Sequence, residues 1–233
     1  MILTKSSRDV ERVPHRASTP ERETWVTSYF GPSRGAGAAT SETPPLGVLY
    51  PVAYLIESPP LSPSEPHFHQ AHQFQVVVGG GGAIGKHPVA NFSVHYASAY
   101  TPYGPISPGT GGIAYMTMRN GFDPGAMRMP QERELLRRGN RKPRMAFGAP
   151  EIAPEPDGLG TWHYRVAAGE RIAGPSPQQG GGQFWLVMDG ELATGAGTLP
   201  RLSCVFVSPD EAPFACAGGP AGCDVLALQF PSG

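Results

Sequence analysis

The chain has 233 residues, with 18 Lys and Arg against 19 Asp and Glu, and its formal net charge is −1. A balance this close to zero gives no general attraction to nucleic acid or to an anionic membrane, and we expect neither as a partner. No apolar stretch is long enough to span a bilayer, and charged residues interrupt the N-terminal region where a signal peptide needs an apolar run. The sequence therefore predicts a cytoplasmic protein.

Glycine and proline are abundant, with 31 and 27 residues, and they separate short apolar runs such as 48–50, 76–78 and 186–188. Helical periodicity is nearly absent. Regular turn signals between short strands are typical of all-β sandwiches and barrels. The three cysteines, Cys204, Cys216 and Cys223, lack zinc-type spacing, and we expect them to be reduced, buried thiols.

Residues 1–45 mix charged, hydroxyl, glycine and proline residues without sustained periodicity, which predicts an irregular N-terminal arm. Within the arm, 24–30 has the composition of a strand, whereas 31–37 is predicted to be a loop. An arm of this kind can extend a sheet or exchange across a homodimer, and the sequence leaves both alternatives open.

Several metal-capable side chains gather in the segment 66–80. His67, His69 and Gln73 occupy alternate positions of a predicted strand, so they share one face of a sheet. If that face points inward, the two imidazoles can bind a divalent cation and the Gln73 amide oxygen can be a third ligand. The alternative is that all three are hydrogen-bonded or solvated strand residues without a metal ion.

Strands and turns follow this segment at short intervals. The glycine run 79–82 predicts a tight reversal, and strands are predicted at 83–87, 92–96 and 113–119. His95 can act as a metal ligand if its side chain points to the same face of the sheet. The sequence does not determine which face that is. His87, beside a proline, is predicted to lie at the surface.

A linker and an internal repeat complete the chain. Residues 130–139 form the best helix candidate, with proline at the start and glycine at the end. The basic residues between 128 and 144 are predicted to be a solvated linker rather than a nucleic-acid site. Residues 183–190 then match 73–80 at an offset of 110, which predicts two tandem barrels. His163 is predicted to be a core or interface residue of the second copy.

The spacing of His67, His69 and Gln73, with Gly80 seven residues further on, resembles the first motif of the cupin superfamily. The family usually has a glutamate at the position of Gln73. The turn at 102–104 resembles the second motif, but Ser107 stands where the family has its last metal-binding histidine. The resemblance covers residues 46 to 231 and implies a bicupin: a first barrel at 46–125, a linker with a short helix at 126–143, and a second, degenerate barrel at 144–233.

The second copy departs further from the motif. Pro177 and Gln179 stand where the first copy has its two histidines, and Phe214 stands at the final ligand position. The resemblance therefore implies that a metal site belongs to the first barrel alone.

The resemblance implies a metal-dependent enzyme that acts on a small organic molecule. Iron would favour dioxygenase chemistry, whereas zinc, nickel or manganese would favour a Lewis-acid lyase or isomerase, and the sequence does not distinguish these metals. The alternative is a non-catalytic cupin that binds a small ligand without a metal ion. Ser107 favours this alternative, and the pair of His67 and His69 opposes it. The other predicted pocket residues are Gln75, His95, Tyr100, Tyr103 and Ser107.

Overall fold

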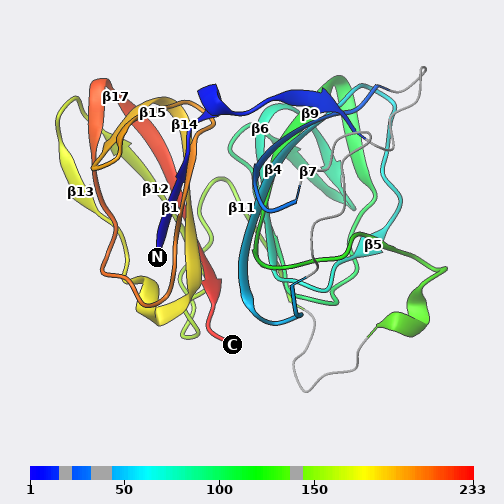
Figure 1. Cartoon of the computed structure of the whole chain (residues 1–233). Coiled ribbons are helices and arrows are strands. Elements are labelled where there is room, and N and C mark those ends of the chain that lie inside the picture. Colours follow the sequence, from blue (N-terminus) through cyan, green and yellow to red (C-terminus); the bar gives the residue numbers. More distant parts are fainter. Residues whose placement is uncertain (16–22, 33–43, 137–143) are drawn as a thin grey trace. The chain divides into compact units, whose positions relative to one another are not determined.

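The structure, a computed structural model, describes residues 1–15, 23–32, 44–136 and 144–233. Most of the regular structure is antiparallel strand, and the chain divides into two compact units (Figure 1). One unit is residues 11–147, and the other joins residues 1–10 to residues 148–233. The predicted all-β fold is confirmed. In the described ranges, no helix is long and apolar enough to cross a membrane.

The first unit contains an eight-stranded antiparallel sheet and a separate pair of short strands. Along the sheet the order is β11-β8-β6-β9-β4-β3-β2, and β7 pairs with β6. The strands are β2 (Arg12–Pro14), β3 (Trp25–Phe30), β4 (Leu49–Ser58), β6 (Gln73–Ile84), β7 (His87–Ala90), β8 (Val94–Ala97), β9 (Ile106–Gly121) and β11 (Met145–Gly148). The separate pair is β5 (His67–Phe68) and β10 (Met127–Arg128).

The second unit contains a seven-stranded sheet with the order β1-β16-β14-β17-β12. Its other two strands attach to this path, β13 to β17 and β15 to β14. The strands are β1 (Ile2–Lys5), β12 (Gly160–Val166), β13 (Arg171–Ala173), β14 (Gly180–Thr194), β15 (Gly197–Pro200), β16 (Cys204–Val207) and β17 (Ala215–Pro231). All three cysteines lie in this unit and are free and buried, as expected.

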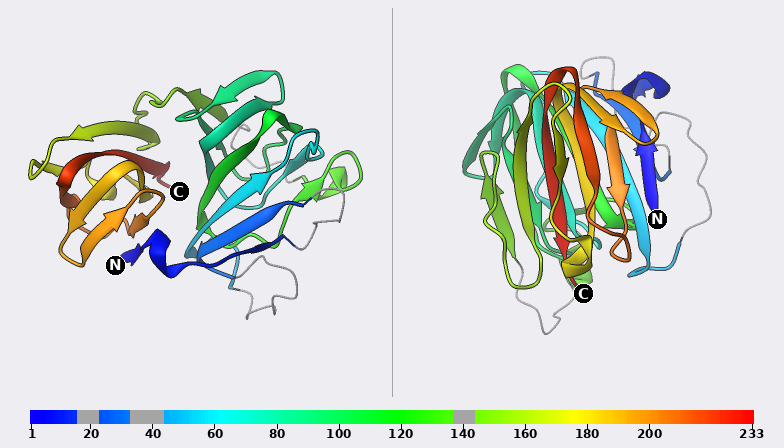
Figure 2. Two further views of the ribbon diagram at one scale, coloured as in Figure 1. Left: turned by 90° about the horizontal axis from the view of Figure 1, so that it is seen from above. Right: turned by 90° about the vertical axis from the view of Figure 1, so that its left-hand side faces the viewer.

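The N-terminal residues do not form a wholly irregular arm. Strand β1 pairs antiparallel with β16 from Ile2–Val207 to Lys5–Cys204, and Figure 2 shows it beside the orange strands of its sheet. A short 3-10 helix, η1 (Ser7–Asp9), follows β1. Strand β3 confirms the strand predicted at 24–30, whereas most of the loop predicted at 31–37 lies outside the described residues. Of the two open alternatives, the described residues show sheet extension within one chain.

Deleting residues 1–5 is expected to destabilise the second unit, because the deletion leaves β16 as an unpaired sheet edge. Each lost ladder hydrogen bond contributes about 1 kcal/mol net, so we expect the free energy of unfolding to fall by about 2–4 kcal/mol. Hydrogen exchange measured on peptides from β16 and β8 checks this. Protection should fall in β16 and stay unchanged in β8, and unchanged protection in β16 would contradict the pairing.

The glycine run 79–82 does not form the predicted reversal. Strand β6 runs through it without interruption, with register shifts against β9 at Val77–Gly79 and Gly80–Gly82. At Gly80 the backbone φ is +64°, and a Cβ atom there would lie 2.3 Å from the Gly112 carbonyl oxygen. The glycines therefore permit bulges and close approach of two strands, and the chain reverses only after Ile84.

The repeat predicted at an offset of 110 is visible in the strand registers. Gln73 pairs with Arg119 between β6 and β9, and Gln183 pairs with Gln229 between β14 and β17. The backbone matches as well. Gly190 has φ +68°, and a Cβ atom there would lie 2.2 Å from the Gly222 carbonyl oxygen, as one at Gly80 would lie 2.3 Å from that of Gly112. Within each sheet, therefore, a glutamine of the repeat lies directly opposite an equivalent residue: Arg119 in the first unit and Gln229 in the second.

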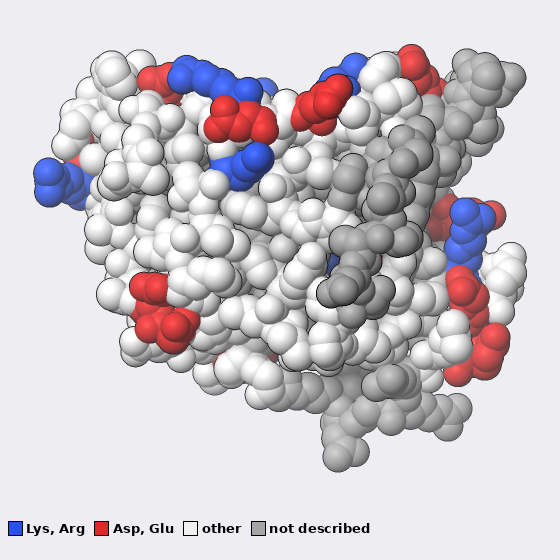
Figure 3. Space-filling view, viewed as in Figure 1, with Lys and Arg blue, Asp and Glu red and all other residues white. Residues whose placement is uncertain are grey.

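The predicted helix at 130–139 is reduced to a 3-10 helix, η2 (Arg133–Leu135), and residues 137–139 lie outside the described part of the chain. Leu135 is 45% exposed, so this segment has no buried apolar face to stabilise a longer helix. On the face shown in Figure 3, charges of both signs are scattered without a large area of one sign, as a net charge near zero leads us to expect.

Candidate functional site

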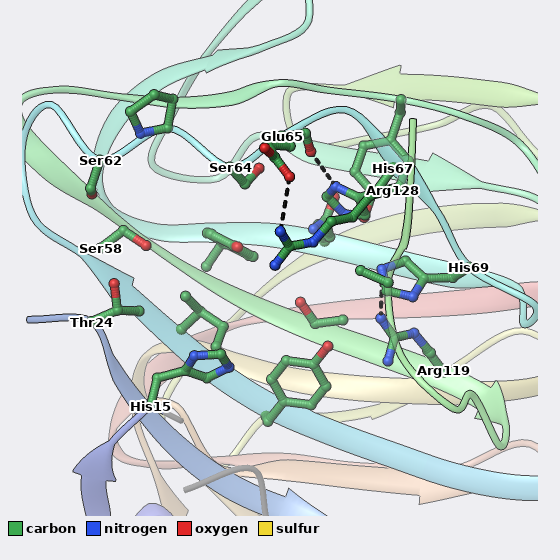
Figure 4. Close-up of a pocket in the computed structure, with 18 residues that line it drawn as sticks. His15, Thr24, Ser58, Ser62, Ser64, Glu65, His67, His69, Arg119 and Arg128 are labelled. Atoms are coloured by element: carbon green, nitrogen blue, oxygen red, sulfur yellow. Dashed lines mark hydrogen bonds and ion pairs between the residues drawn. The ribbon is translucent and has the colours of Figure 1, made fainter. Parts of the chain in front are cut away.

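A polar cavity of about 560 Å³ opens in the first unit. Strand alternation explains much of its lining, because side chains two residues apart point to the same face. Strand β4 contributes Tyr54, Ile56 and Ser58, and strand β9 contributes Tyr115, Thr117 and Arg119. The remaining lining includes His15, Thr24, Ser62, Ser64, Glu65, His67, His69, Gln75, Tyr103 and Arg128. In Figure 4, His67, His69 and Arg119 lie across the cavity from His15 and Thr24.

The two histidines of the first motif are buried side by side at this cavity. His67 is 8% exposed and His69 is 7% exposed, and their ring centroids are 5.1 Å apart. The Nδ1 atom of His67 lies 2.6 Å from the Glu65 carbonyl oxygen, which can only accept, so Nδ1 carries the proton. The Nε2 atom of His67 then accepts a hydrogen bond of 2.9 Å from the Tyr103 hydroxyl.

His69 lies between a buried carboxylate and a buried guanidinium. Its Nδ1 atom donates to Asp123 Oδ2 at 2.8 Å, and its Nε2 atom accepts from an Arg119 terminal nitrogen, Nη2, at 3.1 Å. The other terminal nitrogen of Arg119, Nη1, is 3.3 Å from Asp123 Oδ2. Arg119 is 1% exposed and Asp123 is 2% exposed. The two charges thus neutralise each other inside the barrel, with His69 bound to both.

Gln73 completes this network. Its Oε1 atom accepts two hydrogen bonds from Arg119, from Nε at 3.2 Å and from Nη2 at 3.0 Å. Its Nε2 atom donates to the Tyr103 hydroxyl. The Arg119 guanidinium also lies 5.5 Å from the centroid of the Tyr54 ring, which adds a cation–π contact. Gln73 is therefore a buried amide with hydrogen bonds at both its oxygen and its nitrogen, and it holds the guanidinium in place.

The arrangement does not fit a divalent metal ion. Arg119 donates to His69 Nε2 and to Gln73 Oε1, the two atoms whose lone pairs a metal would need. At an effective dielectric constant of about 20, a divalent ion about 4 Å from the guanidinium is repelled by about 8 kcal/mol. No group of three or more His, Cys, Asp and Glu side chains in the described ranges is arranged to hold a metal ion.

Burial and charge keep the histidines neutral. Burial, reinforced by the nearby Arg119 charge, lowers the pKa of His69 to about 3, and burial also lowers the pKa of His67. Burial raises the pKa of Tyr103, so its hydroxyl stays protonated. Burial alone would raise the pKa of Asp123, but Arg119 and the hydrogen bond from His69 outweigh it and hold that pKa below its usual range. At neutral pH the charged members of the network are therefore Arg119 and Asp123.

The other predicted pocket residues have different positions. Gln75 and Tyr103 line the cavity, whereas His95 lies behind Gln75 and donates from Nδ1 to its Oε1 atom at 2.9 Å. The Nε2 atom of His95 is buried and has no hydrogen-bond partner in the described part of the chain. Tyr100 donates to Gln70 Oε1 at 3.3 Å, and Ser107 pairs with Ala83 in the sheet. Tyr100 and Ser107 are not among the residues that line the cavity.

Sequence reasoning missed Arg119, Asp123 and Arg128. Arg119 ends the strand predicted at 113–119, where an arginine in an apolar run could face either side of a sheet. The internal repeat contained a signal that position 119 belongs to the site. Gln229 lies 110 residues after Arg119, and each of the two residues pairs with the glutamine of its own copy of the repeat. Asp123 and Arg128 follow β9 in the region that we assigned to the barrel end and the linker.

The second unit has a different interior at the equivalent positions. Gln183 donates to Gln229 Oε1 and accepts from Trp185 Nε1 at 3.1 Å, and Gln229 donates to the Gly158 carbonyl at 2.8 Å. Trp185 is fully buried in an apolar core that also contains Phe214. Residues 177 and 179, which replace the histidines, lie in the short 3-10 helix η3 (Pro177–Gln179). This interior is apolar and hydrogen-bonded, without a buried charge at position 229.

No family model and no curated protein matches this sequence. Solved structures do match. A nickel(II) complex of the bacterial pirin YhhW from Escherichia coli matches with a TM-score of 0.59 at 14% identity and covers 100% of both chains. A mutant of oxalate decarboxylase OxdC from Bacillus subtilis matches with a TM-score of 0.59 at 9% identity, over 100% of this chain and 78% of that one.

A third match extends over part of the chain. A mutant of salicylate 1,2-dioxygenase from Pseudoaminobacter salicylatoxidans, in complex with gentisate, has a TM-score of 0.51 at 13% identity and covers 77% of this chain and 68% of that one. Identities this low establish the fold and leave the activity open. The chain is thus an all-β protein of antiparallel sheets, and its fold is consistent with that of cupin jelly-roll barrels.

Proposed function

We propose that the first barrel binds a small organic acid in its polar cavity, without a metal ion. The observation that carries this proposal is the terminal nitrogen Nη1 of Arg119. This buried atom forms an ion pair with Asp123 Oδ2 at 3.3 Å but, among the described residues, has no partner in hydrogen-bond geometry. A buried N–H that makes no hydrogen bond is unfavourable, and a carboxylate oxygen in the cavity would supply a charge-assisted hydrogen bond to it.

A second arginine supports the same class of ligand. Arg128 lines the cavity and forms an ion pair with Glu65 at 3.1 Å (Figure 4). Its side chain is 65% exposed and that of Glu65 is 60% exposed. An exposed ion pair contributes about 0–1 kcal/mol, so Arg128 can exchange Glu65 for a ligand carboxylate at little cost.

The neutral lining groups narrow the ligand further. Hydroxyl groups of Thr24, Ser58 and Thr117 face the cavity together with the phenol groups of Tyr54 and Tyr115. Such a lining suits a ligand that has hydroxyl groups besides its carboxylate, since each polar group needs a partner on desolvation. A hydroxylated organic acid of metabolite size is the ligand class that we propose.

A metal-dependent cupin enzyme, dioxygenase-like or a lyase or isomerase, remains the second candidate. The observation that favours it is the pair of adjacent imidazoles, one of them oriented by Asp123 in the manner of a carboxylate that supports a metal ligand. This candidate requires Arg119 to leave its present position. Measuring transition metals in protein purified without an affinity tag tests it, and stoichiometric metal that is lost in His67→Ala would support it.

Ligand binding is tested by calorimetry and thermal shift with gluconate and benzoate, using the uncharged analogues sorbitol and benzamide as controls. We expect the acids to bind and the analogues not to bind, with the hydroxylated gluconate the tighter of the two acids. A ligand at 100 times its Kd stabilises the folded state by about 2.7 kcal/mol, which a thermal shift detects.

The variant Arg128→Ala should weaken acid binding about 10-fold, because it removes one charged partner of the carboxylate. Arg12→Ala is the matched control, since Arg12 also pairs with a partly exposed glutamate, Glu57, in the same unit but does not line the cavity. If both variants weaken binding equally, or if acids and uncharged analogues bind alike, the proposal is wrong.

A further inference from the structure

We propose that Arg119 is a built-in cation that stands where the motif predicts a metal ion, and that it conceals a divalent-metal site which one substitution uncovers. The inference concerns the cation held by the barrel interior and is independent of which ligand the cavity binds. It rests on three features of the network: the atoms that Arg119 engages, the orientation of His69, and the strand register that places residue 119.

Arg119 engages atoms that otherwise have lone pairs available for a metal ion. Its Nη2 atom donates both to His69 Nε2 at 3.1 Å and to Gln73 Oε1 at 3.0 Å. These are two of the three side chains that the motif assigns to the metal. One side-chain nitrogen therefore lies within hydrogen-bond distance of a nitrogen and an oxygen that converge on the same point.

The orientation of His69 is already that of a metal ligand. Asp123 accepts from His69 Nδ1, which fixes the tautomer with its lone pair on Nε2, directed at Arg119. Metal-bound histidines usually donate their other ring N–H to a carboxylate in this way. Asp123 is itself held by the backbone N–H of Gln70 at 2.9 Å. Removing the guanidinium therefore leaves an oriented imidazole and a buried negative charge without a counter-ion.

The strand register, rather than an adjustable loop, places Arg119 in this position. Arg119 and Gln73 are directly opposite each other on β9 and β6, and Gln229 and Gln183 are opposite each other on β17 and β14. In both sheets the side chain at this position reaches the motif glutamine. A neutral glutamine is thus accommodated at the equivalent place of the same fold, which makes Arg119→Gln a conservative way to remove the charge.

The third motif ligand, His67, is blocked separately. Its Nε2 atom accepts from the Tyr103 hydroxyl, and its Nδ1 proton is held by the Glu65 carbonyl. Tyr103→Phe frees that lone pair without changing the ring. The double variant Arg119→Gln/Tyr103→Phe should therefore bind a divalent ion more tightly than Arg119→Gln alone.

The test uses untagged protein and Ni(II) as the probe, with binding measured by calorimetry and the retained metal measured by elemental analysis after dialysis. Wild type should take up no stoichiometric Ni(II). Arg119→Gln and Arg119→Ala should each bind about one equivalent, at least about 10-fold more tightly than wild type, because the like charge is removed and two ligand atoms are freed. Adding His69→Ala should abolish this gain, and Arg12→Ala should behave as wild type.

Stoichiometric Ni(II) in dialysed wild type would overturn the proposal, and this measurement needs no variant to fold. Folded Arg119→Gln, checked by circular dichroism, that takes up no more Ni(II) than wild type would also overturn it. If neither Arg119 variant folds, the wild-type titration decides. Acid binding by wild type is a separate measurement, so failure of the proposed function is distinguishable from failure of this inference.

Discussion

Replacing Asp123 by asparagine is expected to lower the free energy of unfolding of the first barrel by about 3–5 kcal/mol. Asparagine has nearly the same shape, so the change removes the charge that neutralises Arg119, at 3.3 Å, inside the barrel. It leaves a guanidinium that is 1% exposed without a counter-ion. Thermal unfolding should shift downward by about 10 °C. Hydrogen exchange of peptides from β6 and β9 would assign the loss to this barrel.

The matched control for this prediction is Asp224→Asn in the second unit. Asp224 accepts a hydrogen bond of 2.6 Å from His163, but its side chain is 31% exposed, so solvent screening limits the cost to less than about 1 kcal/mol. Arg119→Met combined with Asp123→Asn should be more stable than Asp123→Asn alone, because it leaves no unpaired cation. Equal losses from Asp123→Asn and Asp224→Asn would show that the buried pair has no special role.

Acidification is expected to destabilise the protein between pH 7 and pH 5. Burial lowers the pKa of His95 to about 3, and burial together with Arg119 lowers the pKa of His69 to about 3, from the ordinary value of 6.5. Between these values the unfolded chain binds a proton at each histidine and the folded chain does not. Stability therefore falls as the pH drops below 6.5, by about 2 kcal/mol for each histidine at pH 5.

Urea unfolding at pH 7, 6 and 5 measures this effect, and the two histidines together should remove about 4 kcal/mol at pH 5. His95→Phe separates the contributions, since the His95 ring already packs against Phe147 with the centroids 4.7 Å apart. That variant should lose the share of His95, about 2 kcal/mol at pH 5, while His69 and His67, whose pKa burial also lowers, retain theirs. A free energy of unfolding that is constant from pH 7 to pH 5 would contradict the burial of both neutral rings.

Motif spacing and strand parity are properties of one short segment, and they were sufficient to group His67, His69 and Gln73, which the structure joins in one hydrogen-bond network. That these residues are metal ligands stays a prediction. The local patterns were insufficient for Arg119 and Asp123. These residues follow Gln73 by about fifty positions. Arg119 reaches Gln73 only through the pairing of β9 with β6, and Asp123, just beyond β9, contacts His69 and Arg119. Whether an arginine in a strand faces the interior depends on the register with a distant strand, which no local pattern determines.

The fold shows the same limit. The glycines at 79–82 are compatible with both a turn and a bulged strand, and the close approach of Gly112 across the sheet decides between them. Residues 2–5 look irregular beside their charged neighbours, yet they form a strand because β16, some two hundred residues later, offers an edge. Composition and turn spacing predicted the fold class correctly. They did not predict these pairings, which join strands far apart in the sequence.

The pairing of β1 with β16 has a consequence for biosynthesis. The ribosome makes residues 2–5 some two hundred positions before residues 204–207, so this edge of the sheet can be completed only after β16 has been made. Residues 11–147 form a compact unit whose strands pair among themselves, and they can fold while the rest is still being made. During that interval the nascent β1 segment has no partner, and a chaperone that binds extended apolar segments would find it accessible.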